Sequence, residues 1–202
     1  MSAASDRAPG ERVWYPLVRL THWAIAAAIV LNSLIVDEHA LVHVWIGYSA
    51  LSLLGLRLLW GLVGPQEARF AAFPPKPRAA WRHAVDMFGG RAHAHRSHNP
   101  LGALMVYALW ATLLVVSISG IALRGEPFPE HDAHGRYGAP YDVVERGAGG
   151  EDWIEEVHEV AAHVLLALAA MHVAGVALES RLSGRNLVGA MITGVRSSRR
   201  EP

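Results

Sequence analysis

The stretch from Val157 to Val173 reads VHEVAAHVLLALAAMHV and lies inside a longer apolar run, from about Ile154 to Leu178. It places His158 and His172 fourteen positions apart. In an α-helix this separation covers roughly 21 Å along the axis, and fourteen steps of about 100° return to within about 40° of four full turns. The two imidazoles would therefore face nearly the same direction, one near each side of a bilayer. A helix with this pattern is suited to holding two stacked cofactors.

The composition favours a membrane protein. Of the 202 residues, 52% are hydrophobic and 18% are charged, which is apolar for a soluble chain. The absence of cysteine excludes disulfides, thiolate iron–sulfur clusters, zinc–thiolate sites and covalently attached c-type haem. The twelve histidines are therefore the strongest candidates for metal ligands.

Four apolar stretches approach the roughly 20 residues that a membrane helix needs. They cover residues 14–36, 41–63, 100–123 and 154–178, approximately. Residues 1–12 are polar and the first apolar run is longer than a signal-peptide core, so we expect a retained span rather than a cleaved signal. The sequence predicts an all-α, integral-membrane four-helix bundle that forms one membrane domain over residues 1–202.

The distribution of basic residues predicts the orientation. Lys and Arg gather in the N-terminal tail, in the loop between the second and third spans and in the C-terminal tail, whereas the first connection has none. The positive-inside rule then places both termini and the middle loop in the cytoplasm. The loop over about 124–153 would lie outside, either as a solvated connection or as a docking surface for a periplasmic partner.

The depths of four histidines match in two pairs. His43 lies in the first turn of the second span and His158 near the start of the fourth, so both lie near the outer face. His22 lies roughly 12 Å into the first span and His172 roughly 9 Å before the end of the fourth, near the inner face. Four such side chains are what bis-histidine ligation of two haems requires. A histidine in a span can instead be a polar bridge between helices or a proton-relay group, but four that pair by depth favour haem.

Other residues lend support, each with an alternative. Gly47, one turn after His43, would let a flat ring approach the helix, and close helix packing explains it equally. Arg57 shares the face of His43 at the inner side, where we favour pairing with a haem propionate over snorkelling to headgroups. For Arg19 the sequence leaves both of these roles open.

His163 faces away from the ligand stripe and is expected to donate a hydrogen bond to another helix. Further candidates for ring approach are Gly120 and Gly175, and the remaining histidines are expected in solvated connections.

Several motifs, in order and spacing, resemble the bacterial cytochrome b561 and nickel-hydrogenase b-type cytochrome family. They are VRLTHW around His22, HVWIGYSALSLLGLRLLWGLVGP from His43, HNPLGALMVYAL at the third span, VHE and MHVAGV around His158 and His172, and the closing NLVGAMITG. The resemblance covers about residues 13–194. It implies a four-helix bundle with two haem b groups, ligated by these four histidines, that carries electrons between quinone and a partner. In some members the partner is a hydrogenase or other dehydrogenase, in others a soluble cytochrome, and some members oxidise superoxide.

The sequence therefore predicts a membrane di-haem cytochrome b that transfers electrons between the quinone pool and a redox partner. Such a chain would be an electron-transfer protein that crosses the inner membrane of a bacterium several times, and turnover of quinone would make it a quinone-linked oxidoreductase. The polar candidates near a quinone are His98 and Arg57. One alternative is a membrane-anchor subunit that relays electrons for a hydrogenase or dehydrogenase; another is a superoxide oxidase, and a remote one is a haem-free transport protein. The expected partners are membrane lipid, quinone and a periplasmic cytochrome or dehydrogenase subunit, with no nucleic acid.

Overall fold

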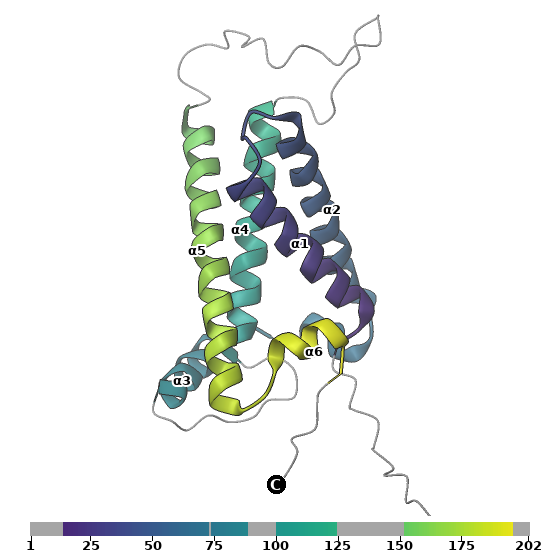
Figure 1. Ribbon diagram of the computed structural model, residues 1–202, viewed down its shortest axis with the longest axis vertical. Coiled ribbons are helices and arrows are strands. Elements are labelled where there is room, and N and C mark those ends of the chain that lie inside the picture. The colour runs from purple at the N-terminus through teal and green to yellow at the C-terminus, as the bar shows by residue number, and fades with distance from the viewer. Residues whose placement is uncertain (1–13, 73, 89–99, 125–151, 196–202) are drawn as a thin grey trace, which may run out of the picture.

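The structure is a computed structural model, and it describes residues 14–72, 74–88, 100–124 and 152–195. These residues form helices and no β-strand. The helices are α1 (Pro16–Leu34), α2 (Leu41–Val63), η1 (Gln66–Ala68), η2 (Phe70–Ala72), α3 (Pro77–Phe88), α4 (Pro100–Arg124), α5 (Asp152–Ser183) and α6 (Leu187–Thr193). Four of them, α1, α2, α4 and α5, are long and apolar enough to span a membrane (Figure 1). The predicted all-helical membrane fold with four spans is confirmed.

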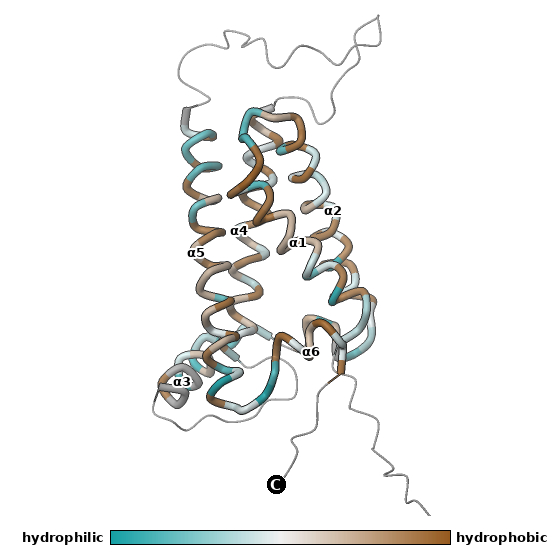
Figure 2. The backbone as a smooth tube through the Cα atoms, viewed as in Figure 1, coloured by the Kyte–Doolittle hydropathy of each residue, from teal (hydrophilic) through white to brown (hydrophobic). Residues whose placement is uncertain are grey.

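Helix α5 extends past the predicted apolar run at its C-terminal end, to Ser183. Its 32 residues cover roughly 48 Å, which exceeds the roughly 30 Å hydrocarbon core of a bilayer. Figure 2 shows hydrophilic residues in its first turns, while its middle is apolar. The ends of α5 therefore reach into the polar layers on both sides.

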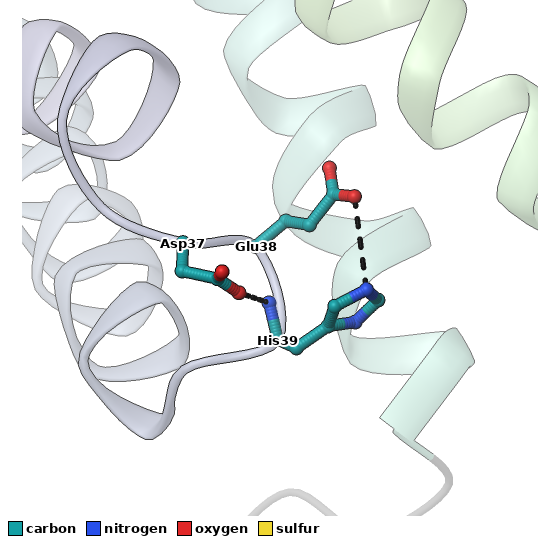
Figure 3. Close-up of polar contacts among 3 residues, drawn as sticks. All are labelled: Asp37, Glu38 and His39. Atoms are coloured by element: carbon teal, nitrogen blue, oxygen red, sulfur yellow. Dashed lines mark hydrogen bonds and ion pairs between the residues drawn. The ribbon is translucent and has the colours of Figure 1, made fainter.

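The turn between α1 and α2 sets the height of His43. Asp37 Oδ1 accepts a hydrogen bond of 2.8 Å from the backbone N–H of His39, as Figure 3 shows, and the backbone N–H of Ala40 donates to the Asp37 carbonyl at 3.0 Å. Asn32 in α1 donates from Nδ2 to the carbonyl of His43 at 3.0 Å. These bonds tie the last turn of α1 to the first turn of α2.

The helices pack as two close pairs, α1 with α2 and α4 with α5. The buried centre holds Ala28, Ala50, Leu54, Leu113 and Leu165. Small residues such as these alanines let helix backbones approach, which matters because lipid removes the hydrophobic drive for helix association. Helices α2 and α4 also touch, whereas α1 and α5 meet in few places. The bundle is therefore looser between α1 and α5 than within each pair.

The segment between α2 and α4 was expected to be a basic loop, and it contains a helix instead. In α3 the side chain of Ala80 is buried, while its neighbour Trp81 is 73% exposed. Helix α3 packs against α4 at one end of the bundle (Figure 1). Its charged residues lie among apolar ones at helical spacing, so no stretch of α3 reaches the mean hydropathy of a membrane span.

The closing NLVGAMITG motif contains the short helix α6. Asn186 Oδ1 accepts the backbone N–H of Gly189 at 2.7 Å and caps the N-terminus. Gly194 ends the helix with φ of 81°, a left-handed conformation that glycine adopts without steric cost.

Arg19 fastens α6 to the start of α1. Its Nε donates to the carbonyl of Met191 at 3.2 Å, and Nη2 donates to the carbonyl of Ile192. The backbone N–H of Trp14 donates to the carbonyl of Gly194 at 3.3 Å. The two described ends of the chain therefore meet at one end of the bundle. In the structure Arg19 binds helix carbonyls, a role that neither sequence interpretation included.

Replacing Gly194 with alanine should release α6 from α1. An alanine there would hold a left-handed conformation, at about 1–2 kcal/mol, and its Cβ would crowd Arg19 Nη1. We expect faster amide exchange in residues 187–193 with exchange in the middle of α5 unchanged, measured by hydrogen–deuterium exchange in detergent. Gly55→Ala is the control, because a Cβ there meets no atom within 4 Å. Unchanged exchange in α6 of the Gly194 variant would contradict this role of the clamp.

Candidate functional site

The four histidines that the sequence singled out lie in two facing pairs. His43 of α2 faces His158 of α5, with ring centroids 6.3 Å apart and ring planes at 61°. His22 of α1 faces His172 of α5, with centroids 6.1 Å apart and planes at 59°. The structure thus brings together the same pairs that the depth argument predicts. Helix α5 supplies one histidine to each pair, roughly 21 Å apart along its axis.

The separation within each pair fits one metal ion between two imidazoles. A metal–nitrogen bond of about 2.0 Å and roughly 1.1 Å from nitrogen to ring centre, taken twice, give about 6.2 Å. Among the described residues, no group of three or more histidine or acidic side chains could hold a metal ion. A metal held at these pairs must therefore bring its other ligands with it. An iron porphyrin does so, because it supplies four equatorial nitrogens and leaves two axial positions.

Two consecutive residues of α4 hold the ring of His158. Ser119 is buried, and its Oγ lies 3.0 Å from Nδ1 of His158. A Cβ on Gly120 would lie 3.0 Å from Cε1 of the same ring, so only glycine leaves the imidazole this space. From the sequence we expected Gly120 to leave room for a flat ring, and the ring that lies against it is the imidazole of His158. Ser119 was not predicted, although a hydroxyl inside an apolar span, next to that glycine, could have indicated it.

One helical turn after one histidine of each pair, a glycine leaves open space. Gly47 follows His43 by one helical turn, and a Cβ on Gly47 would meet no atom within 4 Å. Gly175, one turn after His172, is open in the same way. Both glycines thus leave room beside a histidine. This arrangement fits the approach of a flat cofactor, as expected for Gly47.

Near the inner pair the structure buries a positive charge. Arg57 is 6% exposed, and its Cζ lies 5.1 Å from the ring centroid of Trp110 on α4. Its Nη1 is buried with no hydrogen-bond partner among the described residues. Arg57 lies six residues from the end of α2, and His22 lies six residues after the start of α1, so both stand roughly 9 Å from the same end of the bundle. A buried guanidinium with an unused N–H suits an anionic group such as a haem propionate.

A recess of about 230 Å³ lies beside Arg57. Its walls are apolar and aromatic, and they come from α2, η2 and α4. The lining residues are Leu58, Phe70, Tyr107, Trp110, Ala111 and Leu114. An apolar recess flanked by a cation and a phenol suits a flat, uncharged ligand with polar edges.

Among the side chains that the structure describes, those of the two remaining histidines, His39 and His163, do not join the pairs. His163 is exposed and bonds through Nδ1 to the carbonyl of Glu159 in its own helix at 3.0 Å, not to another helix. His39 is exposed in the α1–α2 turn, with Nε2 3.8 Å from a carboxylate oxygen of Glu38 (Figure 3). Outside the described part of the chain lie the side chain of His83, the residues His93, His95, His98, His131 and His134, and most of the outer loop.

Comparison with known proteins points to one family. The family model for prokaryotic cytochrome b561 matches residues 13–194, which include all four paired histidines. Comparison with curated proteins and with solved structures gives no match. Because the match covers most of the sequence, the chain belongs to the prokaryotic cytochrome b561 family, whose members are membrane b-type cytochromes of electron transfer.

Proposed function

We propose that this chain is a di-haem cytochrome that passes single electrons across the bilayer between quinone and a redox partner. Haem supplies reversible one-electron chemistry when bound, and the protein supplies ligation, burial and spacing. His43 and His158 would hold the outer group, and His22 and His172 the inner one. Because two histidines would hold each haem, substrates would exchange electrons with it without binding iron.

The observation that carries this proposal is the repeated imidazole separation. The two pairs lie at two depths of α5, with their other histidine on α2 or on α1, and each has the spacing of a shared metal ion. Polar bridges between helices would bring ring nitrogens into direct hydrogen bonds, with the rings closer together. The ring centroids within the two pairs instead lie 6.1 and 6.3 Å apart, about the separation expected of two imidazoles that share one metal ion.

We also propose that both termini face the cytoplasm of a bacterium and that residues 1–202 form one membrane domain. The hydrogen bond between Trp14 and Gly194 supports a common side for the two ends. Basic residues at that end include Arg69, Lys76, Arg78, Arg82 and Arg181. The positive-inside rule assigns such an end to the cytoplasm. The pair His22 and His172 then lies on the cytoplasmic side.

We propose the recess beside Arg57 as the place where a quinone ring exchanges electrons with the inner haem. Its aromatic walls suit a flat ring, Tyr107 in the lining carries a phenol hydroxyl, and Arg57 lies against Trp110, another lining residue. The periplasmic partner, a cytochrome or a dehydrogenase subunit, would meet the opposite end. A chain that only anchors and relays for such a partner would be inert with quinone alone, whereas we expect the purified chain, once reduced, to pass electrons to a quinone.

Haem content tests the four-ligand site. The purified protein should contain two haem b per chain by pyridine haemochrome, and His172→Ala should keep one, because the outer pair is intact. The matched control is His163→Ala, which removes an exposed histidine from the same helix and should keep both haems. Two haems in the His172 variant would refute the pairing, and no haem in folded, haem-supplied wild-type protein would refute the cytochrome.

The charge of Arg57 should raise the midpoint potential of the inner haem. A nearby cation favours the form with one more electron, so Arg57→Gln should lower one of the two potentials and Arg57→Lys should restore much of it. A shift on the order of 50 mV, or about 1 kcal/mol, is typical of a charge at protein dielectric. The measurement is an optical redox titration of the purified protein. Potentials that do not move in the glutamine variant would place Arg57 away from the haem.

A further inference from the structure

We propose that Ser119 is a positioning residue that fixes the tautomer of His158 and thereby sets the potential of the outer haem. This proposal rests on the proposed function, since it concerns one of the four ligands. A serine hydroxyl has one donor hydrogen and two acceptor lone pairs.

The single hydrogen of Ser119 has a place within α4. Oγ lies 2.8 Å from the carbonyl oxygen of Val115 and 3.1 Å from that of Val116, so the hydroxyl donates back into its own helix. The third neighbour of Oγ is Nδ1 of His158 at 3.0 Å. With its hydrogen already used, the hydroxyl oxygen accepts, and Nδ1 must carry the proton that it receives.

A protonated Nδ1 leaves Nε2 with its lone pair. In that tautomer Nε2 is the nitrogen that can bind a metal ion, and a hydrogen bond from the other ring N–H fixes ligand orientation and raises ligand basicity. Gly120 supports this arrangement, because its missing side chain lets the ring lie against α4. The partner histidine is not held in this way, since Nδ1 of His43 is buried with no hydrogen-bond partner among the described residues. Ser119 therefore acts on one ligand of one haem.

The test is the potential of the outer haem in a protein that holds only that haem. In the His172→Ala background, Ser119→Ala should raise the single midpoint potential, because a less basic imidazole stabilises ferric iron less. We expect up to about a tenfold change in the ratio of oxidised to reduced haem at a given potential, which is about 59 mV for one electron. The electron paramagnetic resonance signal of the ferric haem should shift with it.

Two further variants separate positioning from general structure. Ser119→Thr keeps the hydroxyl and should restore the potential. Thr112→Ala removes a hydroxyl from α4 that donates to the carbonyl of Ala108, at 2.9 Å, and should leave the potential unchanged. An unchanged potential and signal in Ser119→Ala would overturn the role of Ser119 while leaving the cytochrome intact. Absence of haem from the wild-type protein would instead overturn the proposed function.

A separate surface of the molecule carries a second inference, which does not depend on haem. We propose that α3 binds the phosphate of an anionic phospholipid in the headgroup layer. Arg78 and Arg82 are one turn apart and exposed, and Trp81 and Val85 form a parallel exposed apolar stripe beside them. Pro77, Arg78, Trp81 and Arg82 line a shallow recess on this face.

The location and charge of this face select a lipid. Ala80 turns inward and α3 packs on α4 at the end of the bundle, so the opposite face lies where headgroups surround a membrane protein. An indole at that level inserts into the boundary of acyl chains and headgroups, and guanidinium groups beside it pair with phosphate. Two cations and no described anion in the recess favour a lipid with net negative charge.

Retention of phosphatidylglycerol on the full-length protein tests this site. Protein in detergent micelles would be titrated with this lipid and with phosphatidylcholine, and bound lipid counted by native mass spectrometry. Arg82→Gln should weaken phosphatidylglycerol binding roughly fivefold, and the double variant with Arg78→Gln should weaken it further. Arg181→Gln, which removes an exposed arginine from the same end on α5, is the control and should not change binding. Equal affinity in the double variant, or displacement of the lipid by inorganic phosphate, would overturn the proposal.

Discussion

Two imidazole rings that face each other at about 6 Å, twice in one bundle, impose a spacing that the rest of the fold accommodates. Rings held apart in this way keep the backbones of α1 and α2 away from α5. Close packing must then come from other helix pairs, and the small residues provide it, with Ala28 and Ala50 in the first pair and Gly120 and Ala161 in the second. A group bound between the two rings of a pair would fill the space between α5 and its partner helix. It would also stabilise the folded state by its own binding free energy.

Helix α4 has no paired histidine, yet it shapes both sites. Toward one end its Ser119 and Gly120 hold the ring of His158, and toward the other its Trp110 lies under the guanidinium of Arg57. Helix α6 and Arg19 close the end of the bundle near the inner pair, since they join the start of α1 to the end of α5. The paired histidines come from three helices, and one of them, His158, is held by residues of a fourth.

The spans and the histidine pairs could be predicted because both depend on position along a helix. Hydropathy identifies an apolar run of sufficient length, and a rise of about 1.5 Å per residue converts sequence position into depth. No comparable rule converts sequence position into the side-chain contacts between neighbouring helices. The bond from Ser119 to His158 and the stacking of Arg57 on Trp110 depend on helix rotation, which no residue count gives. Helix α3 was missed because only one of its faces is apolar, and Arg19 because its partners are backbone carbonyls.

The two sites differ in a way that bears on the direction of electron flow. Under the proposed function, a hydrogen bond from Nδ1 of His158 would make that ligand more basic and would favour ferric iron at the outer site. The buried charge of Arg57 would favour the reduced form at the inner site. Both effects raise the inner potential relative to the outer one, and electrons move spontaneously toward higher potential. Under the proposed function, the residues around the histidines therefore favour transfer from an outer donor to a quinone near the inner haem, against a membrane potential that costs about 2.3 kcal/mol per charge for each 100 mV.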